Sequence, residues 1–369
     1  MATLVHRLVY EAPAAEAALL PLGDELGPLG GDAPFTLVED PRHTDRTSIV
    51  GMFVLRPARE AWTTPMLAAG RPDSLFGVRD WCFNVRGEDG GVLISDGNPL
   101  DAYRLALQYG LADAVIVGSN TVATEGVDRE GAPGYLWQPY GPTAWPRLMD
   151  LDPQLEAKIA RVRERWQALG VLSARRWPAQ IVVSASGERR AGAADLLAAR
   201  IFSARHPDGS PVEALILTSV DGAARLRARA ADHGLGDRID DLLVVLSPPH
   251  APAELDLAVL PQHLRARFDM RVANHDGGRR VLSAFSAAGI LPQLNLTLMR
   301  ERSVLDVLAA RGGVGAATEA AVAREFEARR QLFFSADHRL PPALRPLAML
   351  ADDGEAVVVT FDARALRGL

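Results

Sequence analysis

Short apolar runs alternate with segments of helical periodicity along most of the chain. Strands are predicted at residues 47–55, 81–85, 114–117, 181–184, 214–218, 242–246, 270–273, 294–298 and 356–361. Helical patterns lie at residues 99–110, 222–232, 261–267 and 279–288. Continuous apolar strands that alternate with helices are typical of a parallel sheet covered on both faces. The pattern therefore predicts the α/β class, with a mostly parallel central sheet and helices on both faces.

The two ends of the chain depart from this rhythm. The last predicted strand follows an Asp-Asp-Gly turn at 352–354, so we expect a C-terminal antiparallel hairpin. Residues 1–75 are rich in Pro, Gly and Ala and show little periodicity apart from the strand at 47–55. We therefore expect an irregular N-terminal extension at 1–75, packed on a single main domain at 76–369.

Residues 126–178 form an insertion that is longer than an ordinary connection between strands. Its first half is rich in aromatic residues, which favours contact with a ligand. These residues are Tyr135, Trp137, Tyr140 and Trp145. Its second half predicts an amphipathic helix that begins at Pro153, after the N-cap residue Asp152. We expect this helix to pack on its own domain; a lid over a pocket and a dimer contact are the alternatives.

Composition excludes several classes of function. The net charge is −6, from 40 Lys plus Arg against 46 Asp plus Glu, so the basic balance of sequence-independent nucleic-acid binders is missing. The single cysteine, Cys82, permits no internal disulfide and no cysteine-rich zinc site, and the eight histidines include no paired metal motif. We therefore expect no bound metal. Since neither a signal peptide nor a run of about 18 apolar residues is evident, we also expect a cytoplasmic protein that does not contact a membrane.

The most informative stretch joins the strand at 270–273 to the helix at 279–288. The residues between them are Asn274, His275, Asp276, Gly277 and Gly278. A glycine pair lets the backbone approach a ligand closely, and the free N–H groups of a helix start favour a phosphate. An ordinary Gly-Gly turn is the alternative interpretation.

A second junction of this kind follows the strand at 114–117. It consists of Gly118, Ser119, Asn120, Thr121 and Val122. Open α/β sheets bind ligands at the carboxyl ends of their strands, although an ordinary turn with a helix N-cap is the alternative here. Two such junctions in one parallel sheet favour a dinucleotide across the sheet edge. Neither carries the G-x-G-x-x-G fingerprint, which disfavours the common Rossmann interpretation.

These residues resemble a known family. Residues 276–290, followed by 294–298, resemble a signature of the pyrimidine reductases of riboflavin biosynthesis, in which an acidic-Gly-Gly turn opens a helix before a Leu-x-Leu-Thr strand. Residues 112–122 resemble the second signature of that family, and residues 181–184 resemble more weakly a strand that ends at the substrate. The resemblance implies a dihydrofolate-reductase-like fold, NADPH as hydride donor and a homodimer.

The resemblance also implies cofactor-binding residues at the two turns and at one further strand end. They are Gly118, Ser119, Thr121, Val122, Ser219, Asp276, Gly277, Gly278 and Arg279. Ser219 follows Thr218 at the strand end where such folds hold the adenosine 2′-phosphate, and Arg225 lies near it in sequence. The alternative for the Ser219 hydroxyl is an N-cap of the next helix.

The family's first strand carries a lysine followed by Ser-Leu-Asp-Gly, and this chain departs from that pattern. The best alignment sets the motif against residues 87–90, which keeps Asp89 and replaces the serine by Gly87. Lys158 is the only lysine, so Arg86 becomes the candidate for the missing charge. The implied substrate-binding residues are Asn84, Arg86 and Ser184, for a substrate other than the usual phosphoribosyl pyrimidine. The single cysteine also excludes the zinc deaminase domain of bifunctional relatives.

Hydride transfer from a nicotinamide also needs a proton source. His275 and Asp89 are the candidates, with a surface-loop histidine and a plain turn residue as the alternatives. The predicted function is an NADPH-dependent reductase acting on a C=N or C=O bond of a small polar substrate. The alternative is a non-catalytic ligand-binding or partner protein on the same fold.

Overall fold

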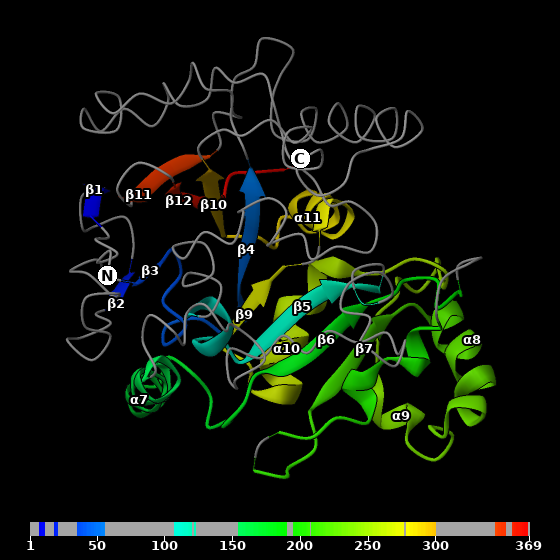
Figure 1. The fold of residues 1–369 in the computed structure, drawn as a ribbon. Coiled ribbons are helices and arrows are strands. Elements are labelled where there is room, and N and C mark those ends of the chain that lie inside the picture. The colour runs from blue at the N-terminus through cyan, green and yellow to red at the C-terminus, as the bar shows by residue number, and fades with distance from the viewer. Residues whose placement is uncertain are drawn as a thin grey trace, which may run out of the picture.

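Ten strands form one sheet at the centre of this computed structural model (Figure 1). Their order across the sheet is β1-β11-β12-β10-β4-β9-β5-β6-β7-β8. The structure describes residues 7–11, 18–20, 35–55, 107–119, 122, 154–189, 195–206, 208–276, 278–299, 344–351 and 356–367. The predicted strand at 81–85 and the first part of the predicted helix at 99–110 lie outside these residues.

The elements follow the predicted alternation of strands and helices. The strands of the large sheet are β1 (Arg7–Glu11), β4 (Ser48–Leu55), β5 (Ala114–Gly118), β6 (Ala179–Val183), β7 (Ala214–Thr218), β8 (Leu243–Val245), β9 (Val272–His275), β10 (Gln293–Met299), β11 (Arg345–Ala351) and β12 (Ala356–Asp362). A separate antiparallel pair consists of β2 (Ala18–Leu20) and β3 (Phe35–Leu37). The α-helices are α7 (Leu155–Ala168), α8 (Val220–Ala230), α9 (Ile239–Leu242), α10 (Leu260–Phe268) and α11 (Gly278–Ala287), and residues 107–110 are also helical.

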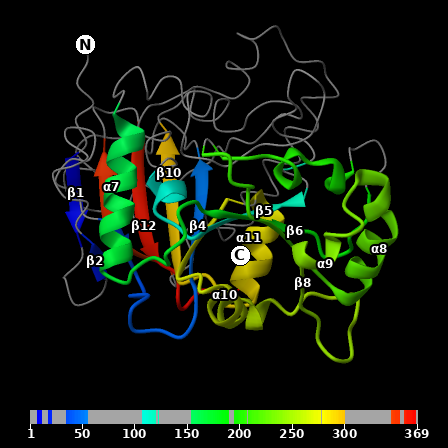
Figure 2. The same ribbon diagram turned by 90° about the horizontal axis from the view of Figure 1, so that it is seen from below.

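The sheet is parallel from β10 to β8 and antiparallel at its other end. β4 pairs in parallel with both β10 and β9, and β5 to β8 continue the parallel set. β12 pairs antiparallel with β10 and β11. β1 pairs antiparallel with β11 and is the edge strand on that side of the sheet (Figure 2). The predicted α/β class and the C-terminal antiparallel pair are therefore confirmed.

Two buried cores cover the two faces of the sheet. On β5 the side chains alternate: Ala114 and Ile116 belong to one core, whereas Val115 and Val117 belong to the other. The first core is covered by α10 and α11, and the second by α8 and α9. Burial on both faces explains why β5 is apolar throughout rather than alternating.

The N-terminal region contributes directly to the sheet, which corrects the expected division at residue 76. β4 lies in the interior of the sheet, with Gly51 level with His275 of β9 on one side and Leu294 of β10 on the other. The sheet therefore includes strands from the first 75 residues. The strand at 47–55 was expected, but its apolar pattern alone does not tell an interior position from an appended one.

The helix of the long insertion packs on its own domain, as expected. Ile159, Val162 and Trp166 of α7 are fully buried. The helix begins at Leu155, two residues later than predicted, and the side chain of its N-cap residue Gln154 does not cap it. The aromatic residues of the first half of the insertion lie outside the described part of the chain.

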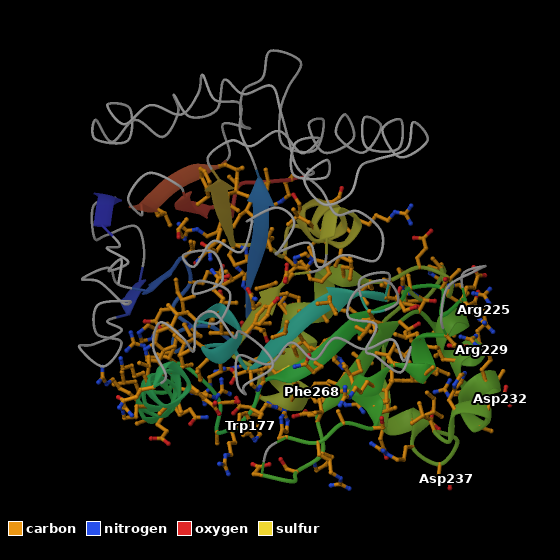
Figure 3. The ribbon with its side chains drawn as sticks, viewed as in Figure 1. Trp177, Arg225, Arg229, Asp232, Asp237 and Phe268 are labelled. Carbon is orange, nitrogen blue, oxygen red and sulfur yellow. The ribbon has the colours of Figure 1, made fainter. Side chains whose placement is uncertain are left out.

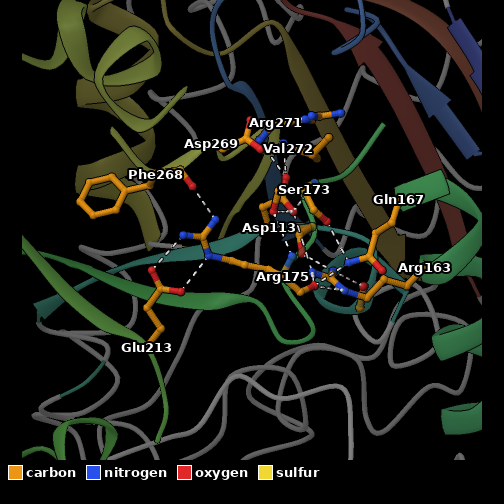
Figure 4. Close-up of polar contacts among 12 residues, drawn as sticks. Asp113, Arg163, Gln167, Ser173, Arg175, Glu213, Phe268, Asp269, Arg271 and Val272 are labelled. Carbon is orange, nitrogen blue, oxygen red and sulfur yellow. Dashed lines mark hydrogen bonds and ion pairs between the residues drawn. The ribbon is translucent and has the colours of Figure 1, made fainter. Parts of the chain in front are cut away.

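A buried polar network ties α7 to the amino end of β5 (Figure 4). The Asp113 carboxylate accepts hydrogen bonds from Ser173 Oγ at 2.7 Å and from the backbone N–H of Arg271 at 2.8 Å. The Arg163 guanidinium lies 3.8 Å from Asp113 and donates to the carbonyls of Gly110 and Ala112, at 2.9 and 2.6 Å. This network lies at the end of the strands opposite the two glycine turns.

Among the residues that the structure describes, none of the helices has the length and apolar character needed to span a membrane.

Candidate functional site

The two predicted glycine junctions lie side by side, because β5 and β9 are neighbouring parallel strands. From β5 the chain continues to β6 on one side, whereas from β9 it continues to β10, beyond β4 on the other side. Strand order therefore reverses between β5 and β9. In open α/β sheets such a reversal opens a crevice at the carboxyl ends, and that is where ligands bind. The Asp276 N–H also donates to the Ile116 carbonyl at 2.9 Å, which holds the two junctions together.

The first junction offers backbone rather than side chains. Gly118 ends β5 and is buried, and Ser119, which follows it, is half-buried. Val122 is fully buried and belongs to the second core, so its side chain packs inside the protein. Any ligand contact by Val122 would therefore have to use its backbone.

The second junction places a helix start at the same edge. α11 begins at Gly278, directly after the β9 turn, so its first N–H groups have no partner within the helix. Asp276 is half-buried, and its carboxylate accepts a hydrogen bond from the hydroxyl of Tyr109. Tyr109 lies in the helical turn at 107–110, and no sequence pattern connected it with Asp276.

His275 is the last residue of β9, and its side chain is fully buried on the face covered by α11. Its ring lies against Phe285, with 4.9 Å between the ring centroids. Within the described part of the chain neither ring nitrogen has a hydrogen-bond partner. Burial lowers the pKa of His275 to about 4, so the ring is neutral at pH 7. A surface-loop histidine was the expected alternative, and the structure contradicts it.

No role was predicted for Asn274 from the sequence, but the structure buries its amide beside the proposed site. It precedes His275 and points to the opposite face, because side chains alternate along a strand. Only 2% of the residue is exposed, and both Oδ1 and Nδ2 lack a hydrogen-bond partner among the residues described. The apolar pattern placed Asn274 in the turn after the strand at 270–273, whereas β9 extends to His275 and includes it.

Ser219 is the N-cap of α8, which was the alternative to a phosphate contact. Its hydroxyl accepts from the Gly222 N–H at 3.0 Å and donates to the Ala185 carbonyl at 2.7 Å. Thr218 donates in the same way to the carbonyl of Ser184, at 2.7 Å. Ser219 is fully buried and Ser184 is 7% exposed. The geometry therefore gives no support to a phosphate contact by the Ser219 hydroxyl.

The loop after β6 closes over the start of α8. Gly187 has a left-handed backbone with φ of +61°, and a Cβ on it would collide with the carbonyl of Gly222. Arg225, which lies along α8 beside Arg229 (Figure 3), donates to the Ser186 carbonyl at 2.9 Å. Arg225 thus holds the loop on the helix.

Several predicted site residues lie outside the described residues and stay predictions. They are Asn84, Arg86, Asp89, Thr121, Gly277 and the side chain of Arg279. In the described ranges, no three or more His, Cys, Asp or Glu side chains gather as metal ligands would.

Comparison with known proteins gives matches only at the level of structure. No protein-family model and no curated protein matches the sequence. A pyrimidine reductase-like protein from Corynebacterium diphtheriae matches with 15% identity and a TM-score of 0.42, over 86% of this chain and 91% of that one. The riboflavin biosynthesis reductase Rib7 of Saccharomyces cerevisiae matches with 11% identity and a TM-score of 0.38, over 87% of this chain and 91% of that one.

Acinetobacter baumannii RibD matches with 11% identity and a TM-score of 0.36. That match covers 86% of this chain and 58% of RibD. The Corynebacterium and Saccharomyces proteins are named as a reductase-like protein and a reductase. At these identities and scores, neither activity nor substrate follows from the likeness.

Proposed function

We propose that this protein is an NADPH-dependent reductase that transfers a hydride to a C=N or C=O bond of a small polar substrate. The observation that carries the proposal is the adjacency of the Gly118 and Gly278 junctions at the carboxyl ends of neighbouring parallel strands, where strand order reverses. The sequence resemblance of both junctions to the pyrimidine reductases supports it independently. NADPH supplies the hydride when it is bound.

The residues of this edge fit a dinucleotide. Gly118 and Gly278 carry no side chain that would keep the phosphates or ribose from the backbone. The first N–H groups of α11 favour a diphosphate, because a helix start has unpaired donors and a positive dipole end. Ser119 adds a hydroxyl at the first junction.

Proton supply places a further condition on the mechanism. With a pKa of about 4, His275 has no imidazolium to donate at pH 7, so only the N–H of its neutral ring is available. Asp89 stays the second candidate for the proton donor. A homodimer is part of the proposal and is tested by the mass of the protein in solution.

Cofactor binding is the decisive test. Titration with NADPH should quench the intrinsic tryptophan fluorescence of the wild type. Gly278→Asp should abolish the quenching, since it places a negative charge and a side chain at the start of α11. Gly236→Asp is the matched control: its position in the loop between α8 and α9 is exposed and has room for a side chain, so NADPH affinity should not change.

Two outcomes decide between the candidate functions. If NADPH does not bind to the wild type, the reductase proposal is wrong. If NADPH binds but is not oxidised with any member of a panel of imines and ketones, the protein is a ligand-binding relative that has lost catalysis.

A further inference from the structure

Asn274 places a buried amide on β9, an interior strand of the sheet. The neighbours level with Asn274 are apolar: Val50 of β4 and Val115 of β5. Asn274 is 2% exposed, yet both polar atoms of its amide lack a protein partner in the described part of the chain. Burying such a group without a partner costs stability, because its hydrogen bonds to water are lost. An occupant that supplies the missing hydrogen bonds would remove this cost.

The amide lies on the side of β9 that leads to the proposed site. Asp276, two residues further on, continues the ladder beside β5 through its bond to Ile116 and shares the face of Asn274. Tyr109, which belongs to the second core on that face, donates to the Asp276 carboxylate. Asn274 thus lies under the carboxyl edge, next to the strand reversal, whereas His275 points to the other face.

The chemistry of an amide restricts what can satisfy it. A primary amide presents one acceptor oxygen and two N–H donors side by side in one plane. A phosphate or carboxylate would satisfy only the donors, and a hydrocarbon would satisfy neither. Another amide satisfies both, because the two groups form a pair of antiparallel N–H···O bonds.

We propose that Asn274 binds the carboxamide of the nicotinamide ring of NADPH. This inference rests on the proposed function. Pairing with Asn274 would fix the rotation of the carboxamide and, through it, the orientation of the ring. The residue is thus a specificity-determining contact that recognises the amide rather than the phosphates of the cofactor.

The test compares NADPH with reduced 3-acetylpyridine adenine dinucleotide phosphate. This analogue has the same phosphates and carries a methyl group in place of the amide NH2. The wild type should bind NADPH about tenfold more tightly, because the analogue leaves the buried Oδ1 of Asn274 unpaired. Asn274→Leu should lose this preference and bind NADPH more weakly than the wild type does, because it can make neither bond to the amide.

Two controls separate binding from folding. The thermal midpoint of Asn274→Leu should equal or exceed that of the wild type, since the variant removes an unpartnered polar group of similar size. Ser48→Ala removes another buried, unpartnered polar atom on the same face, level with Val272 and nearer the amino end of β9. It should leave the preference for NADPH unchanged.

The results that overturn the inference are distinct from those that overturn the function. Equal affinity of the wild type for both compounds overturns it without reference to any variant. A preference that survives in Asn274→Leu also overturns it, because the discrimination then does not come from Asn274. If the wild type binds neither compound, the proposed function itself fails, and the inference fails with it.

Discussion

The hydroxyl of Tyr109 donates a hydrogen bond to the carboxylate of Asp276, 167 residues further along the chain. It connects the helical turn before β5 to the loop after β9, and these are the two strands whose carboxyl ends make the proposed site. Tyr109 is almost fully buried in the second core, so it offers a fixed donor to a half-buried acid.

Tyr109→Phe should loosen the β9 loop while keeping the core packed. We expect unfolding free energy to fall by about 1 kcal/mol, the usual worth of one hydrogen bond, and NADPH affinity to fall several-fold. Urea unfolding and fluorescence titration measure the two effects. Tyr109→Leu, which also removes the ring, should cost more stability than Tyr109→Phe. Unchanged NADPH affinity in Tyr109→Phe would show that the bond does not shape the site.

Because His275 is buried as a neutral ring, the free energy of unfolding should decrease as the pH is lowered. The unfolded chain binds a proton at the ordinary histidine pKa of 6.5, whereas the folded protein does so only near 4. Between these values the unfolded state holds more protons, so stability is full above pH 6.5 and falls as the pH approaches 4. The difference is on the order of 3 kcal/mol.

His275→Leu should flatten this pH dependence, as urea unfolding at pH 7.5, 5.5 and 4 would show. Burial also lowers the pKa of His206 and His263, so the wild type keeps part of its slope in any case. The comparison of variant with wild type isolates His275. Equal slopes in the two proteins would mean that its ring is not held neutral by burial.

The network around Asp113 should be costly to break. Arg163→Met removes the ion pair with the buried Asp113 carboxylate and the hydrogen bonds from Arg163 to the carbonyls of Gly110, Ala112 and Arg175. We expect a loss of about 3 to 5 kcal/mol in unfolding free energy. Arg161→Met on the same helix is the control; because Arg161 is exposed, its loss should stay below about 0.5 kcal/mol. Similar losses for both variants would argue against a structural role for the network.

Ser219→Ala separates the two interpretations of that residue. Loss of an N-cap should lower stability by about 1 kcal/mol while the preference for NADPH over NADH stays the same. Ser203→Ala is a control, since its exposed hydroxyl only donates to the Arg200 carbonyl. If Ser219→Ala instead loses affinity for NADPH but not for NADH, the hydroxyl of Ser219 contacts the 2′-phosphate, as the resemblance implies.

The local pattern of apolar and polar residues was sufficient to predict where most strands and helices lie. β5 and β7 match their predicted apolar runs, because a strand buried on both faces is mostly apolar along its length. β10 matches its predicted range to within one residue at each end, although its polar and apolar residues alternate. The start of α11 was placed within one residue by the glycine pair before it. The α7 stripe likewise indicated a packed helix, since a periodic apolar face needs a partner surface.

By itself, then, the sequence determined the α/β class, the positions of most strands and the two glycine junctions. Only the tertiary structure decided that β9 lies between β4 and β5, which brings the junctions together, because parallel pairing joins segments that are far apart in sequence. It also placed β4 inside the sheet and buried His275 and Asn274 on opposite faces. These outcomes depend on the order of the strands and on which helix covers each face of the sheet. Neither can be predicted from the residues of a single strand.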